Sequence, residues 1–123
     1  MPKNLVSSTS NEYDDLFVGG SFPVVVDTVT LKSGAAYKRG TVLGLITTGG
    51  LAVAVDSTKS DGSQKAYAVL ADDVDATLAN TVATGYFTGE FNAAALSFGG
   101  TDTIATHKTA LRALSIFAKA VQG

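Results

Sequence analysis

The chain of 123 residues contains no cysteine and no tryptophan, and its only histidine is His107. Without cysteine it cannot form disulfides, thiolate metal sites or a thiol nucleophile. A Ser-His-Asp triad or a histidine-ligated metal would have to use His107, which we expect at a surface position on a helix. No acid–base pair occurs at a recognisable spacing. The sequence therefore predicts no enzyme, no metal and no cofactor.

The chain also lacks an excess of basic residues and any long apolar run. Nine Lys and Arg stand against eleven Asp and Glu, which gives a net charge of −2. Binding to nucleic acid needs clustered basic residues, and a membrane span needs about 20 apolar residues in a row. Residues 1–10 lack the charged and apolar regions of a signal peptide. We therefore expect synthesis in the cytosol, with neither nucleic acid nor membrane as a partner.

The first 20 residues differ in composition from the rest of the chain. They are rich in Ser, Thr, Asn and Asp and end in Gly19-Gly20, so they would not form a core of their own. They are interpreted either as a frayed terminus or as an arm that orders on a partner. Residues 21–123 are predicted to form a single domain. The spaced apolar residues that suit a binding arm are Leu5, Val6, Tyr13, Leu16 and Phe17.

Most of the remaining chain has the composition of β-strands. Short β-branched and apolar runs alternate with short Gly-rich or polar segments, which is typical of strands joined by tight turns. The predicted strands are residues 22–31, 41–46, 51–55, 66–70 and 81–87. The second and third flank Gly49-Gly50, and this pattern predicts a β-hairpin, since Gly tolerates the positive φ that such turns require.

The polar segments between these runs are predicted to be loops. Residues 56–63 and 71–80 separate strands, and the second segment contains Asp72, Asp73 and Asp75. These carboxylates could bind Ca²⁺, but they lack the spacing of a calcium loop, so a solvated turn is favoured.

One helix is predicted near the C-terminus. Residues 101–103 (Thr-Asp-Thr) are of the types that cap a helix start, and Ile104, Leu111 and Leu114 follow at helical spacing. A last strand is predicted at Ile116 and Phe117. The predicted fold is therefore a mostly β domain with one short α-helix near the C-terminus.

Five segments from Lys38 onward, taken in order, resemble the bacteriophage head decoration family typified by the phage lambda protein. They read KRGTVLG (38–44), DGSQ (61–64), AVLADDVDA (68–76), TGEFN (88–92) and ALRALSIF (110–117). The resemblance implies a small, β-tulip-like domain with an extended N-terminal arm. It further implies a homotrimer that binds the major capsid protein on the outside of the mature capsid at three-fold or quasi-three-fold positions. There it would stabilise the shell against the pressure of packaged DNA.

The resemblance also suggests which residues carry these roles. By position, the arm at residues 1–20 would contact the shell through its apolar residues Leu5, Val6, Tyr13, Leu16 and Phe17, although it lacks the Ala/Pro character of the lambda arm. The motif residues that would support the fold or the trimer are Gly40, Leu43, Gly44, Leu70, Asp73, Gly89, Phe91 and Ile116.

A different class of function remains open at this point. The domain could be a carbohydrate-binding or adhesin-like β module, in which exposed tyrosines stack on sugars. The tyrosines expected to be exposed are Tyr13, Tyr37, Tyr67 and Tyr86.

Overall fold

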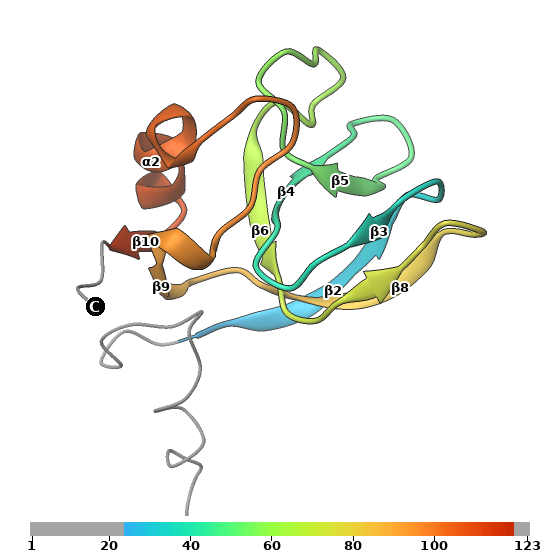
Figure 1. The fold of residues 1–123 in the computed structure, drawn as a ribbon, viewed down its shortest axis with the longest axis horizontal. Helices are drawn as coiled ribbons and strands as arrows, with labels where there is room; N and C mark the ends of the chain where they lie inside the picture. The colour runs from blue at the N-terminus through green and yellow to red at the C-terminus, as the bar shows by residue number, and fades with distance from the viewer. Residues whose placement is uncertain (1–23, 120–123) are drawn as a thin grey trace, which may run out of the picture.

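The computed structural model describes residues 24–119. Short strands make up most of the regular structure, and one α-helix follows near the C-terminal end of the described chain (Figure 1). The predicted mostly β fold is therefore confirmed, whereas the arm lies outside the described residues. The elements in chain order are β2 (Val26–Leu31), β3 (Ala36–Tyr37), β4 (Val42–Leu45), β5 (Ala52–Ala54), β6 (Ala66–Leu70), β7 (Val74–Asp75), β8 (Thr81–Tyr86), β9 (Gly89–Asn92), the 3-10 turn η1 (Ala93–Ala95), α2 (Ile104–Ala113) and β10 (Ile116–Lys119).

Five of these strands close into a barrel in the order β2-β5-β4-β6-β8. β2 runs antiparallel to β8 along its whole length, from Val26 opposite Tyr86 to Leu31 opposite Thr81. The barrel closes where Leu31 pairs in parallel with Ala52 of β5.

The predicted hairpin is present between β4 and β5. Leu43 lies opposite Ala54, and the Ile46 N–H donates to the Leu51 carbonyl at 2.8 Å. Gly49 and Gly50 adopt φ values of +90° and +69°, which residues with a side chain rarely take. The two glycines therefore make the tight turn possible.

Alternation along the barrel strands creates two cores, because successive side chains of a strand point to opposite faces. Leu43 and Leu70 point into the barrel. Their neighbours Val42 and Val69 point outward, into a second core beneath the helix. The barrel core consists of Val29, Leu31, Tyr37, Leu43, Ala52, Leu70 and Ala76. The outer core consists of Val42, Val55, Val69, Phe91, Leu96, Leu111 and Ile116.

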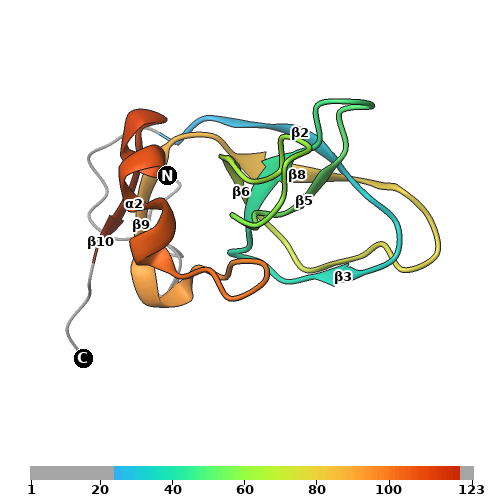
Figure 2. The ribbon, with the colours of Figure 1, turned by 90° about the horizontal axis from the view of Figure 1, so that it is seen from above.

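The outer core is covered by α2 and by the two-stranded parallel sheet of β9 and β10, which gather at one end of the barrel (Figures 1 and 2). α2 begins after Thr103, whose N–H donates to Thr106 Oγ1 at 3.2 Å. It ends before Ser115, which takes a φ of +66° as the chain turns into β10. The predicted helix and the predicted final strand are both confirmed.

Three short strands were not predicted, namely β3, β7 and β9. β3 and β7 form a separate antiparallel pair in which Ala36 lies opposite Asp75 and Tyr37 opposite Val74. The expected loop at residues 71–80 therefore contains a strand. β3 and β7 are each only two residues long, so neither has a pattern of its own, and each exists because the other lies beside it.

Candidate functional site

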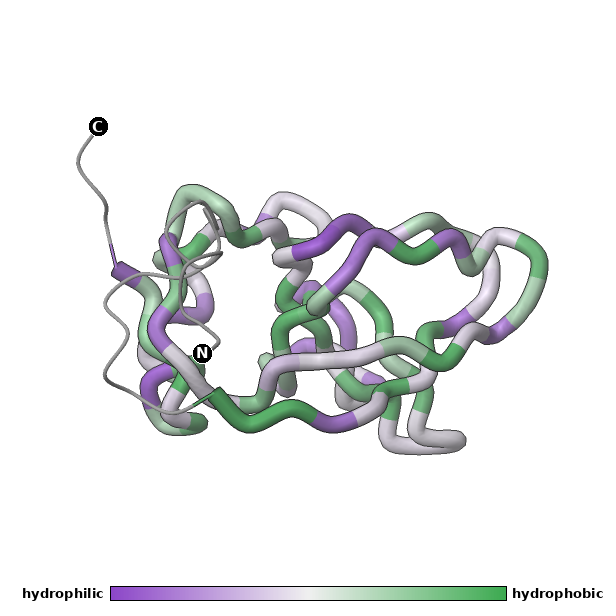
Figure 3. Tube along the Cα trace, turned by 90° about the horizontal axis from the view of Figure 1, so that it is seen from below, coloured by the Kyte–Doolittle hydropathy of each residue, from purple (hydrophilic) through white to green (hydrophobic). Residues whose placement is uncertain are grey.

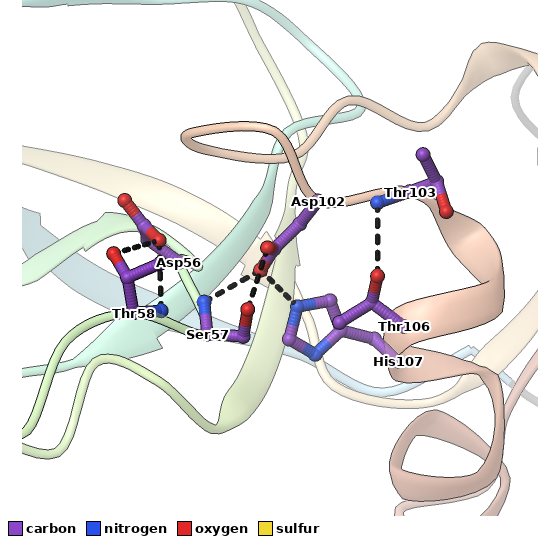
Figure 4. Close-up of polar contacts among 7 residues, drawn as sticks. All are labelled: Asp56, Ser57, Thr58, Asp102, Thr103, Thr106 and His107. Carbon is purple, nitrogen blue, oxygen red and sulfur yellow. Dashed lines mark hydrogen bonds and ion pairs between the residues drawn. The ribbon is translucent and has the colours of Figure 1, made fainter.

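The only histidine of the chain is buried. His107 is 3% exposed, so the prediction of a surface position is wrong. Its Nε2 lies 2.6 Å from Asp102 Oδ2, and the ring of Phe98 stacks on the imidazole with the centroids 5.6 Å apart (Figure 4). The neighbours of His107 at positions 106 and 108 are polar and exposed, whereas the His107 side chain lies on the buried side of the helix. The buried orientation of His107 could have been inferred from Leu111, because residues four positions apart lie on the same side of a helix.

The same carboxylate also binds Ser57, in the loop that follows β5 (Figure 4). The Ser57 N–H donates to Asp102 Oδ2 at 2.6 Å, and the Ser57 hydroxyl donates to Oδ1 at 2.7 Å. The hydrogen bond from the Ser57 hydroxyl, followed in strength of effect by the one from His107, holds the pKa of Asp102 below its ordinary value.

This arrangement of Ser, His and Asp is structural. In a nucleophilic triad the imidazole lies between the serine and the carboxylate, where it can accept the serine proton. Here the carboxylate of Asp102 lies between Ser57 and His107, so the hydroxyl donates to the carboxylate. The cluster therefore fastens the loop after β5 to the start of α2.

The acidic segment of the 71–80 connection does not converge on one site. Asp73 Oδ1 accepts the Arg39 N–H at 2.7 Å, whereas Asp75 Oδ1 accepts from the hydroxyl and N–H of Thr77. The bonds from Thr77 lower the pKa of Asp75. Within residues 24–119 no three acidic or histidine side chains gather as metal ligands would.

The tyrosines do not form a shared stacking platform. Tyr37 is buried and donates its hydroxyl to the Lys32 carbonyl at 2.9 Å, so its expected exposure is wrong. Tyr67 contacts Phe87 edge to face at 5.2 Å, and Tyr86 packs near Phe91. Tyr13 lies outside the described residues.

Several motif residues gather where the chain enters β4. Gly40 adopts a φ of +90°, and its N–H donates to the Leu70 carbonyl at 2.9 Å. Leu43 and Leu70 are buried in the barrel core, and Asp73 binds the backbone of Arg39 beside them. A Cβ at Gly44 would overlap the backbone of the 56–65 loop.

The other motif residues form the β9–β10 sheet. Gly89 lies opposite Ile116, and the side chains of Phe91 and Ile116 are fully buried in the outer core. Gly89 has a φ of +146°, and a Cβ there would press on the ring of Phe91. The structure thus brings the eight motif residues into two structural groups.

One face of the barrel wall is uncharged and partly exposed. The positions of β2 and β8 that point away from the barrel core are Val26, Thr28, Thr30, Val82, Thr84 and Tyr86, and we call them the β2–β8 outer face. Val26 is 55% exposed and Val82 is 67% exposed. A partner could bury this face without removing a charge from water.

The described chain begins next to this face. Figure 3 shows the start of β2 as a hydrophobic stretch, and Val24, Val25 and Val26 are all exposed. The Val25 N–H donates to Thr88 Oγ1 at 3.1 Å, and the Val25 carbonyl accepts the Phe87 N–H at 2.7 Å. The arm residues Leu5, Val6, Tyr13, Leu16 and Phe17 lie outside the described residues, so their role stays a prediction.

No helix within residues 24–119 is long and apolar enough to cross a membrane. A search among curated proteins gives no match. A comparison with protein families matches residues 6–118 to the bacteriophage lambda head decoration protein D. This match covers nearly the whole chain, including the segments that carried the resemblance in the sequence. The chain therefore belongs to the lambda head decoration protein D family and is a phage capsid decoration protein.

Proposed function

We propose that this protein binds the outer surface of the mature capsid as a homotrimer at three-fold or quasi-three-fold positions, and that it stabilises the shell against the pressure of packaged DNA. The observation that carries the proposal is the family match over residues 6–118, which spans most of the arm as well as the domain. The protein would be made in the host cytoplasm and join the virion after the shell expands.

The arm is the proposed contact with the major capsid protein. Its apolar residues Leu5, Val6, Tyr13, Leu16 and Phe17 are spaced along a polar segment. An extended segment can add to a sheet edge of the shell through main-chain hydrogen bonds while its side chains fill pockets. The affinity of a single arm would be modest, because ordering it costs entropy.

A trimer would bind the capsid more tightly than a single arm can. Once one arm binds, the second and third contacts become intramolecular, and the overall affinity rises without any new type of contact. The β2–β8 outer face is the proposed surface between copies, because it is uncharged, mostly β-branched and exposed at Val26, Thr28 and Val82.

The eight motif residues act, in this proposal, through the fold. Leu43, Leu70, Phe91 and Ile116 fill the two cores, and Gly40, Gly44, Gly89 and Asp73 allow or fix the backbone around them. In this proposal the eight motif residues therefore maintain the folded domain to which the arm is attached.

Electron microscopy of the purified virion tests the location. We expect trimeric protrusions at the three-fold positions of the full head, and capsids without them would refute the proposal. Binding of the chain lacking residues 1–20 to mature capsids tests the arm. We expect the truncated domain to fold, as measured by circular dichroism, and to lose most of its capsid binding. If it bound as well as the full chain, the arm would not be the contact.

A further inference from the structure

The loop between β5 and β6 contains the only Asp-Gly pair of the chain, Asp61-Gly62 (Figure 1). This pair belongs to the DGSQ segment at residues 61–64. An aspartate followed by a glycine is chemically labile, because glycine has no side chain to hinder attack of its nitrogen on the neighbouring carboxyl group. The pair is therefore a candidate site for isoaspartate formation.

The reaction has two steps that need only solvent water. In the first, the Gly62 nitrogen loses its proton and bonds to Cγ of a protonated Asp61 carboxyl group. The bond from Cγ to the hydroxyl oxygen breaks, and the hydroxyl leaves as water, so the product is a cyclic succinimide. In the second, a water molecule opens the ring at either carbonyl. Opening at one carbonyl restores aspartate, and opening at the other gives isoaspartate, whose main chain is one methylene longer.

The fold requires the labile pair. Gly62 has a φ of +108°, which residues with a side chain rarely adopt. A Cβ there would overlap Thr47 Oγ1 and would lie 2.7 Å from the Leu45 carbonyl oxygen. The Asp61 carbonyl accepts the Thr47 N–H at 2.8 Å, which joins this loop to the β4–β5 turn. A larger residue at position 62 would therefore remove the lability at the expense of the loop.

Ser63 restrains the carboxyl group of the pair. Asp61 Oδ1 accepts the Ser63 hydroxyl at 2.5 Å and the Ser63 N–H at 3.0 Å. Ser63 is fully buried, so it holds this geometry firmly. These two bonds hold the pKa of Asp61 below its ordinary value, and the charge of Lys59 acts in the same direction. The protonated carboxyl group that the first step consumes is thereby made scarce.

Gln64 restrains the nitrogen of the pair. The Gly62 N–H donates to Gln64 Oε1 at 2.8 Å. The nitrogen must release this proton and approach the Asp61 side chain, so the hydrogen bond has to break before the ring can close. The two residues that follow the pair thus restrain its two reacting groups separately.

We propose that Asp61-Gly62 is a modification site at which isoaspartate forms when the loop opens, and that Ser63 and Gln64 suppress this reaction in the folded domain. A modified copy cannot restore the native loop, because the Ser63 backbone packs directly on Gly44 and leaves no space for an extra methylene. The DGSQ segment therefore combines a turn with the protection of that turn. This inference concerns the chain itself and does not depend on the proposed capsid function.

Ageing the protein in mildly acidic buffer tests the proposal. Trypsin cleaves after Lys59 and Lys65, and chromatography with mass spectrometry separates the two forms of the 60–65 peptide against synthetic standards. Ageing in water labelled with oxygen-18 adds one labelled oxygen to residue 61 for each passage through the succinimide, which identifies the route. We expect the folded wild type to form isoaspartate at least about tenfold more slowly than a free peptide of residues 56–67, the factor expected from a hydrogen bond to a charged group.

Two variants remove the two restraints one at a time. Ser63→Ala deletes the hydroxyl and should speed the reaction roughly tenfold to a hundredfold, as for the loss of a hydrogen bond to a carboxylate. Gln64→Met keeps the shape of the side chain without the acceptor and should speed it roughly twofold to tenfold. The matched control is Thr58→Val, which deletes the equivalent hydroxyl bond to Asp56 in the same loop and should leave the rate unchanged.

Circular dichroism and denaturant midpoints report that each variant is folded before ageing. If Ser63→Ala does not fold, Gln64→Met decides the question, because Gln64 is only half-buried. Isoaspartate formation in the wild type at the peptide rate, equal acceleration by Thr58→Val, or unchanged rates in both test variants would each overturn the proposal. Isoaspartate that carries no labelled oxygen would exclude the succinimide and would overturn it as well.

Discussion

Aspartates followed two positions later by a serine or threonine organise three loops of the domain. In each, one carboxylate oxygen accepts both the N–H and the hydroxyl of the second residue. The pairs are Asp56 with Thr58, Asp61 with Ser63, and Asp75 with Thr77. Because these bonds favour the charged carboxylate, they lower the pKa of each aspartate. Asp102 has a lowered pKa for the same reason, through Ser57 first and then His107.

The lowered pKa values predict that acid weakens the fold. A carboxylate whose folded pKa is below its unfolded pKa contributes stability above the unfolded value, and this stability is lost as the pH falls through the folded value. We therefore expect the urea concentration at the midpoint of unfolding to stay constant near neutral pH. It should decrease once the pH is below about 4, where unfolded aspartate titrates.

The Asp102→Asn variant should unfold more easily than the wild type at pH 7 and should lose less stability on acidification. Asp72→Asn removes the same charge from an exposed carboxylate that accepts no hydrogen bond within the described residues, so it serves as the control. Parallel pH curves for the wild type and Asp102→Asn would show that the cluster around Asp102 does not contribute.

Gly44 is required because of space. A Cβ there would lie 2.8 Å from the Ser63 Cα and would overlap the Ser63 carbonyl. We expect Gly44→Ala to lower the free energy of unfolding by at least about 1–3 kcal/mol, the usual cost of overpacking, in denaturant titrations. Gly85→Ala is the matched control, since a Cβ there meets its nearest atom at an ordinary 3.4 Å. Equal losses in both variants would contradict this account.

Single residues were the hardest to place from the sequence. The pattern around His107 predicted its helix correctly, but the predicted surface position was wrong. The burial of His107 depends on Asp102, Phe98 and the distant Ser57. The need for Gly44 was suggested only by the family-like motif, since Ser63 meets it through the folded loop. Contacts of this kind leave no periodic signal in the chain.

At the scale of elements, α2 is held to the barrel through its buried face. Leu111 is fully buried in the outer core, whereas Leu114, just after the helix, is 39% exposed. We expect Leu111→Ala to cost about 2–5 kcal/mol of unfolding free energy, as large-to-small core changes do. Leu114→Ala should cost clearly less, and chemical denaturation of both variants makes the comparison. Similar losses would mean that α2 is not fastened by this core.

Elements with their own pattern were predictable, and those that depend on a partner were not. Residues 66–70 are apolar and β-forming enough to define β6, and Gly49-Gly50 defines the β4–β5 turn. β3 and β7 are two residues long and form strands only by pairing with each other, so no local preference marks them. The parallel pairing of β9 with β10 could not be predicted from the sequence either, because it brings together segments on either side of α2.

At the scale of the whole molecule, the candidate binding surfaces lie near one another. The chain enters the domain at Val24, beside Gly89 of the β9–β10 sheet, and then runs directly into the β2–β8 outer face. The sequence predicted an arm and a domain but not this adjacency, which follows from the pairing of β2 with β8. Assembly and attachment would therefore depend on neighbouring parts of one surface.

This adjacency makes the association of copies testable apart from the arm. Val82 is 67% exposed on the β2–β8 outer face, where a buried carboxylate would have no partner among the uncharged positions of that face. We expect Val82→Glu to weaken trimer formation at least tenfold, measured by analytical ultracentrifugation, while leaving the fold intact by circular dichroism. Thr48→Glu adds the same charge at the exposed β4–β5 turn and should not change assembly. If Val82→Glu formed trimers as readily as the control, the copies would have to meet through another face. If the wild type is monomeric in solution, the same comparison on isolated mature capsids should show Val82→Glu binding with reduced avidity, because its three arms would no longer act as a unit.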